Sequence, residues 1–162
     1  AYLIEVLEKV GLFNEKLLRT EDNEFHYRIR KAGFKLCFNP NILSYQYARS
    51  DYKRMIKQKY ANGYWIGLTF KVCPGCISLY HLVPFVFVVA IVFTSLLSLF
   101  GIWQFSALMW GLYGLLALTN TVLSGIQSGF YLQHLAMPIM FLILHISYGI
   151  GTEIGLFSKI EK

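Results

Sequence analysis

Charged side chains are missing from the second half of the chain: no Asp, Glu, Lys or Arg occurs between Val72 and Thr152. A helix of a soluble protein needs a polar face toward water, so this absence excludes an ordinary water-soluble domain here. One helical crossing of a bilayer takes roughly 20 residues. The 81-residue stretch therefore has room for three crossings, which we predict at 80–101, 105–126 and 130–150.

Cysteine is also scarce, with only Cys37, Cys73 and Cys76 in the chain. The last two form a C-x-x-C segment, but no further Cys or His pair lies nearby to complete a zinc site. The βαβ context of a thioredoxin-like redox pair is missing as well. We therefore expect ordinary thiols at the membrane edge.

The positive charge is confined to the first part of the chain, where thirteen of the fifteen Lys and Arg lie between Lys9 and Lys71. Because this region borders the apolar stretch, attraction to anionic lipid head groups or to a pyrophosphate is a simpler account than nucleic-acid binding. The same charges predict a multi-pass protein of the cell (inner) membrane with a cytoplasmic N-terminal part. Three crossings would put the tail outside, whereas a re-entrant segment would leave it cytoplasmic. The sequence leaves both open.

Two short helices are predicted in the basic region. The first, at 3–10, stops at Gly11. The second follows Thr20 as its N-cap, carries acidic residues in the first turn, where the helix dipole favours negative charge, and ends near Ala32 before Gly33.

Two extended segments, 35–39 and 42–48, are predicted to follow as strands. The order helix–strand–strand indicates the edge of an α/β layer. Because about 50 residues cannot bury a full α/β core, we expect an N-terminal partner region that this chain lacks.

A basic amphipathic helix is predicted at 51–71. Such a helix next to an apolar span is typical of an interfacial helix lying on the membrane, and the alternative is an ordinary surface helix. The predicted apolar face carries Tyr52, Met55, Ile56, Tyr60, Tyr64 and Phe70.

Carboxylates cluster in Glu21-Asp22-Asn23-Glu24, and Arg28 follows Glu24 at the spacing of a helical ion pair. In structural terms this is a capped, solvated helix start. A functional interpretation needs the surrounding motifs, which are the turn Gly11-Leu12-Phe13-Asn14-Glu15, the carboxylate cluster, Arg28, Gly33 and Pro40.

This ordered set resembles the acceptor-side half of the inverting family-2 glycosyltransferases, which have the GT-A fold. Arg49, Gln58, Gly63 and Trp65, and the ending at 145–152, resemble the membrane-bound succinoglycan-synthesis type of that family. The resemblance covers nearly the whole chain.

The resemblance implies that Asp22 is the catalytic base, which takes a proton from the acceptor hydroxyl as it attacks the sugar. Glu21 and Arg28 would orient the loop and balance charge. The donor would be a nucleotide sugar, and the acceptor a lipid-linked sugar or a polysaccharide. Mg²⁺ or Mn²⁺ is expected in the full-length enzyme, held by a D-x-D motif that this chain does not contain.

Gln58 and Trp65 are the implied substrate-binding residues, corresponding to the family's Q-x-x-R-W element. Their spacing is seven instead of four, and Tyr64 replaces the Arg. The pyrophosphate would then be bound by Arg49, Lys57 or Lys59. The alternative role for Trp65 is an interfacial anchor.

The predicted organisation is an α/β fragment of a GT-A catalytic domain at 1–50, the interfacial helix at 51–71 and a transmembrane helical region at 72–162. Membrane lipids are expected partners, and a polymer channel would require a homo-oligomer. Two other functions stay open: a non-catalytic membrane subunit with a basic cytoplasmic head, and a transporter. The latter is disfavoured because no charged residue lies in a predicted span.

Overall fold

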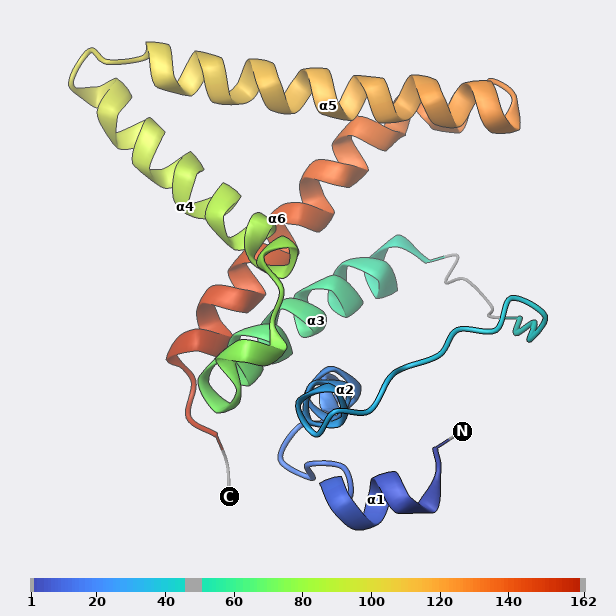
Figure 1. Cartoon of the computed structure of the whole chain (residues 1–162). Helices are drawn as coiled ribbons and strands as arrows, with labels where there is room; N and C mark the ends of the chain where they lie inside the picture. Colours follow the sequence, from blue (N-terminus) through green and yellow to red (C-terminus); the bar gives the residue numbers. More distant parts are fainter. Residues whose placement is uncertain (1, 46–50, 161–162) are drawn as a thin grey trace.

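The computed structural model describes residues 2–45 and 51–160, and these form α-helices joined by loops and two short 3-10 turns (Figure 1). The α-helices are α1 (Ile4–Val10), α2 (Glu21–Lys31), α3 (Tyr52–Val72), α4 (Leu79–Leu99), α5 (Gln104–Ser128) and α6 (Met137–Phe157). The 3-10 turns are η1 (Pro74–Cys76) and η2 (Leu132–Ala136).

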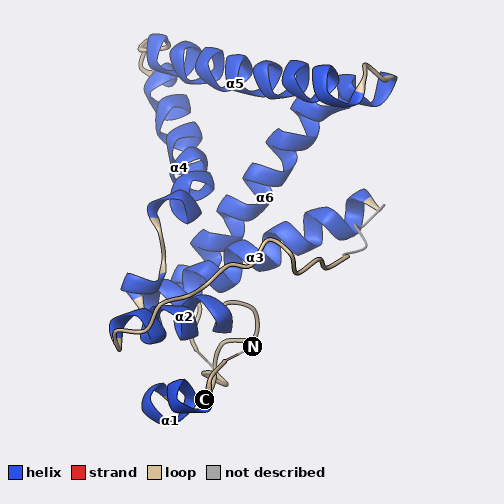
Figure 2. Ribbon diagram, turned by 45° about the vertical axis from the view of Figure 1, so that its right-hand side comes forward, coloured by secondary structure: helices blue, strands red, loops and turns tan. Residues whose placement is uncertain are grey.

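The predicted α/β fragment of a GT-A fold is wrong, because no strand occurs in the part of the chain that the structure describes (Figure 2). The segment 35–39 is a loop, and Phe38 within it is 90% exposed. A strand needs the backbone groups of a neighbour to pair with, and the described residues offer none. The second segment, predicted at 42–48, is a loop as far as Tyr45, and its remainder lies outside the described residues.

The two short helices of the basic region agree with the prediction. Gly11 and Gly33 end them with φ of 81° and 91°, values that glycine adopts readily. α1 and α2 share a small core of Val6, Phe25 and Ile29. We call residues 2–33, which contain both helices, the head.

α3 and α6 pack through glycines on both sides of their contact. A Cβ at Gly63 or Gly67 would overlap the carbonyl oxygens of Tyr148 and Thr152, and a Cβ at Gly155 would overlap that of Tyr64. Residue numbers rise together along the contact, so the two helices run parallel. Small residues let helix backbones approach this closely.

The face of α3 that contacts α6 carries small and aliphatic residues. Its buried residues are Gly63, Ile66, Gly67, Leu68 and Thr69. On the predicted apolar face, Tyr52 and Tyr60 are exposed, and the other four residues are half-buried. The apolar pattern of a sequence shows where bulky side chains lie. A close contact between two helix backbones needs small residues instead, so this pattern does not reveal it.

Three helices are long and apolar enough to cross a membrane, as predicted: α4, α5 and the helical stretch Leu132–Phe157. The third was predicted to end at Ile150 but continues to Phe157. Gly149, Gly151 and Glu153 resemble a helix end in the sequence. In the structure, Gly149 lies against the Pro84 carbonyl of α4 and Gly151 against the Tyr60 carbonyl of α3.

Cys73 and Cys76 form a disulfide between the end of α3 and the turn before α4. The expectation of ordinary thiols is therefore wrong for this pair. Cys37 is a free, exposed cysteine.

The C-terminal segment lies beside the head. Lys71 at the end of α3 donates a hydrogen bond to the Ser158 carbonyl, and Lys159 and Ile160 line a cavity together with Phe13 and Leu18 of the head. Figure 1 shows α5 lying across the far ends of α4 and α6, away from α1 and α2. This arrangement favours two crossings, by α4 and α6, with α5 along the far membrane surface.

We therefore expect the head and the tail to face the same side of the membrane. In sealed vesicles, a membrane-impermeant maleimide should label Cys37 and, in a Cys37→Ser background, Lys159→Cys from one side. Ile102→Cys, between α4 and α5, should be labelled only after permeabilisation. Labelling of Lys159→Cys together with Ile102→Cys would instead establish three crossings.

Candidate functional site

The first turn of α2 carries the predicted catalytic carboxylates. Asp22 is exposed, and its Oδ1 accepts a hydrogen bond from the backbone N–H of Asn23 at 2.8 Å. Glu21 is half-buried, and its Oε2 is buried without a hydrogen-bond partner among the described residues. Asp22 is thus the carboxylate that an incoming molecule can reach.

Arg28 ties α2 to the segment that follows α1. Its Nε and Nη2 donate to the buried Glu24 carboxylate at 2.6 and 2.9 Å, which confirms the predicted ion pair. Nη1 donates to the Val10 carbonyl at 2.5 Å and Nη2 to the Leu12 carbonyl at 2.7 Å. With every guanidinium nitrogen engaged in the head, Arg28 is placed to hold the loop and not to touch a substrate.

The start of α2 is fixed to α3. Thr20 precedes the helix as predicted, but its hydroxyl makes no capping bond and instead hydrogen-bonds to the Thr69 hydroxyl. Both residues are buried. Arg19 adds a 3.0 Å bond from Nη1 to Asn62 Oδ1. The exposed Asp22 therefore extends from a helix start that is held on two sides.

A cavity of about 750 Å³ lies among the head, α3 and the tail; we call it the head cavity. It has both charged and aromatic walls. It is lined by Phe13, Asn14, Glu15, Lys16, Leu18, Tyr64, Trp65, Leu68, Lys159 and Ile160.

The predicted substrate residues have different positions relative to this cavity. Trp65 is in its wall, in edge-to-face contact with Tyr64. Gln58 is half-buried on α3 and is not part of the lining, nor is Asp22. Arg49 lies outside the described residues. The structure thus brings Trp65 together with the motif turn at 11–15, but not with Gln58.

Two cations in the head cavity were missed by the sequence analysis. Lys16 and Lys159 come from opposite ends of the chain, and no local pattern joins residues so distant. Only the packing of α6 on α3 places the tail there.

Among the described residues, no group of three or more His, Cys, Asp or Glu is arranged to hold a metal ion. The residues present therefore do not fit the expected Mg²⁺ or Mn²⁺, and no catalytic step is assigned to a metal in this chain.

Comparison with known proteins identifies a sugar transferase as a relative. The chain is 33% identical over 149 residues to dolichyl N-acetyl-α-D-glucosaminyl phosphate 3-β-D-2,3-diacetamido-2,3-dideoxy-β-D-glucuronosyltransferase of Methanococcus voltae. The match covers 89% of this chain but 42% of the relative, so the chain spans less than half of the relative's length. No protein-family model and no solved structure matches the chain.

Proposed function

We propose that the chain is part of an inverting family-2 glycosyltransferase that moves a sugar from a nucleotide-sugar donor to a lipid-linked acceptor. The observation that carries this proposal is the exposed Asp22 on a helix start that is fixed to α3, next to helices apolar enough for a membrane. The relative supports it, since its name is that of a sugar transferase with a dolichyl-linked acceptor.

In this mechanism the Asp22 carboxylate accepts the proton of the acceptor hydroxyl. The acceptor oxygen forms a bond to the anomeric carbon while the bond from that carbon to the nucleotide diphosphate breaks. The diphosphate leaves with the bonding electrons, and the single displacement inverts the anomeric centre. A base must lie within hydrogen-bond reach of the proton that it removes, and an exposed carboxylate on an anchored helix meets that requirement once the acceptor is bound.

The other predicted residues have supporting roles in the proposal. Arg28 keeps the loop in place through its bonds to the Val10 and Leu12 carbonyls, and Glu21 would balance charge beside Asp22. Trp65 offers an aromatic face in the head cavity for a sugar ring, and Gln58 contributes a polar group on α3. Residues 1–50 would then belong to the catalytic region, 51–71 to the membrane-surface platform and 72–162 to the membrane anchor. The divalent cation stays an expectation for the complete enzyme, with ligands supplied from outside this chain.

A transfer assay tests the function. Membranes containing the protein as it is expressed are given radiolabelled nucleotide sugars one at a time, together with a polyisoprenyl-phosphate-linked acetamido sugar. We expect one donor to yield a labelled lipid product that is absent from membranes without the protein. If a complete donor panel gives no labelled lipid or polysaccharide above that control, the chain is not part of a transferase, and the non-catalytic membrane subunit becomes the better interpretation.

A further inference from the structure

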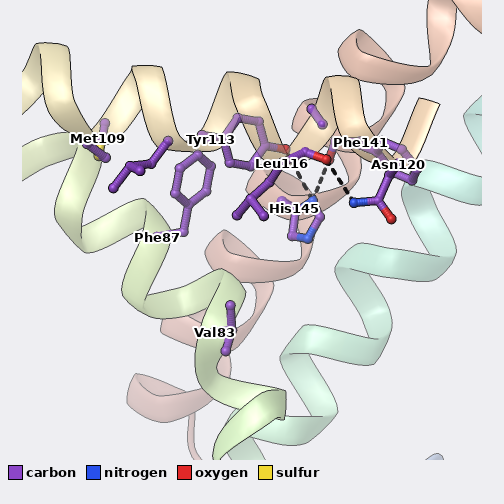
Figure 3. A pocket seen from close by; sticks show the side chains of 10 residues that line it. Val83, Phe87, Met109, Tyr113, Leu116, Asn120, Phe141 and His145 are labelled. Carbon is purple, nitrogen blue, oxygen red and sulfur yellow. Dashed lines mark hydrogen bonds between the residues drawn. The ribbon is translucent and has the colours of Figure 1, made fainter. Parts of the chain in front are cut away.

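A cavity of about 480 Å³ lies among α4, α5 and α6; we call it the membrane cavity. Figure 3 shows Phe87 of α4, Tyr113 of α5 and His145 of α6 directed toward one another at its centre. The rings of Phe87 and Tyr113 stack at 4.4 Å between centroids. The size falls within the range of about 300–1,000 Å³ that is usual for ligand sites.

The polar groups in this cavity are engaged within the protein. Asn120 Nδ2 donates to the Leu116 carbonyl at 2.8 Å, and His145 Nδ1 donates to the Phe141 carbonyl at 2.7 Å. The Tyr113 hydroxyl lies 3.3 Å from the same His145 nitrogen. The surface left for an occupant is therefore mainly aromatic and aliphatic, which favours a hydrocarbon.

The membrane cavity is open to the surroundings of the helices. Val83, Leu112 and Leu116 line it and yet are 56%, 55% and 63% exposed. A hydrocarbon chain of a lipid in the bilayer can therefore enter the cavity from the side, between the helices, without passing through water.

A second cavity of about 430 Å³, which we call the junction cavity, lies among α3, α4 and α6. Phe141 and His145 line both cavities, so the two are neighbours along α6. Lys59 of α3 lines the junction cavity, with His81 and Tyr80 from the first turn of α4. Of the described residues that line either cavity, Lys59 alone carries a full formal charge at neutral pH.

The pair of cavities is thus cationic at the α3 end and apolar beyond it. An ordinary core cavity needs no such polarity, and a soluble substrate would not favour the hydrocarbon end. A long-chain lipid with a phosphate at one end matches both ends, because a lysine ammonium forms charge-assisted hydrogen bonds with phosphate.

We propose that the joined cavities bind the polyisoprenyl phosphate part of the acceptor, with the phosphate at Lys59 and His81 and the chain in the membrane cavity. This assignment rests on the proposed function, which supplies the lipid-linked acceptor. It adds a binding site for the lipid itself that is separate from Asp22 and from the head cavity.

Photolabelling of the protein in phospholipid vesicles tests the site without requiring catalysis. The probe is a polyisoprenyl phosphate with a diazirine on its chain. Ala117 is buried in the cavity wall, whereas its neighbour Leu118 is 57% exposed. Ala117→Phe should therefore lower labelling about tenfold by filling the cavity, and Leu118→Phe should leave it unchanged. Val83→Phe fills the cavity from α4 and replaces Ala117→Phe if that variant does not fold.

A second pair of variants tests the phosphate end of the site. Lys59→Gln should also weaken labelling about tenfold, because a charged hydrogen-bond donor is lost. Lys53→Gln is the control, since Lys53 is an exposed lysine of the same helix that lines neither cavity. A phospholipid with a diazirine on its acyl chain should label all variants equally.

Equal labelling of the wild type, Ala117→Phe and Val83→Phe by the polyisoprenyl probe would overturn the site. So would a phospholipid probe that reports the same losses, which would assign the cavity to bulk lipid. Because labelling needs no donor, sugar transfer with unchanged labelling refutes this site alone, and specific labelling without any transfer refutes only the proposed function.

Discussion

Replacing Asp22 by Asn should lower sugar transfer by about 10²–10⁴-fold, the usual contribution of a general base. The amide keeps the size of the side chain but cannot accept the proton of the acceptor hydroxyl. The loss should appear in kcat with KM little changed, because the residue acts on the transition state more than on ground-state binding. Initial rates at varied acceptor concentration measure it.

Asp51→Asn is the matched control for this experiment. Asp51 is the other aspartate of the chain, is also exposed at a helix start, and accepts a bond from the Lys53 N–H at 2.9 Å. It should transfer at the wild-type rate, with both variants present in the membrane at equal amounts. If Asp22→Asn retains full activity, or if both variants lose activity equally, Asp22 is not the base.

Gly67→Leu should separate α3 from α6. A Cβ at this position would overlap the Thr152 carbonyl and come within 2.7 Å of the Leu156 nitrogen. Backbone atoms cannot rotate away as a side chain can, so the helices themselves must move apart. We expect the free energy of unfolding to fall by at least about 3 kcal/mol, the upper end of the usual cost of overpacking. The midpoint of thermal unfolding in detergent should fall by roughly 10 °C.

Gly114→Leu provides the comparison, because a Cβ at Gly114 of α5 meets nothing within 4 Å. This variant should unfold at the wild-type temperature. The unfolding temperature of Gly67→Ala should lie between those of Gly67→Leu and Gly114→Leu. A Gly67→Leu protein as stable as Gly114→Leu would show that the close contact of α3 with α6 does not hold the molecule together.

Local signals in the sequence predicted local structure well. Gly11 and Gly33 marked the ends of α1 and α2 because a positive φ is a property of the single residue. The spacing of Glu24 and Arg28 predicted their ion pair, since both lie on one helix. The uncharged stretch after Val72 predicted the apolar helices because bilayer thickness fixes their length.

Features that depend on distant partners were not predictable in this way. The extended segment at 35–39 has strand-like residues, but a strand exists only where another pairs with it. The contact of α3 with α6 was not predicted, because the glycines of α3 meet a helix some 85 positions later in the sequence. The resemblance singled out Asp22 and Trp65, and the structure places only Trp65 in a described cavity.

The contact between α3 and α6 also forms late during synthesis. α3 is made long before α6, so its glycine face has no native neighbour until α6 has been translated. A nascent chain that stops after α5 carries the head, α3 and two apolar helices, but the glycine face of α3 stays uncovered. α6 is therefore the helix that completes the contact with α3, and nascent chains that lack α6 should be prominent substrates for membrane proteases.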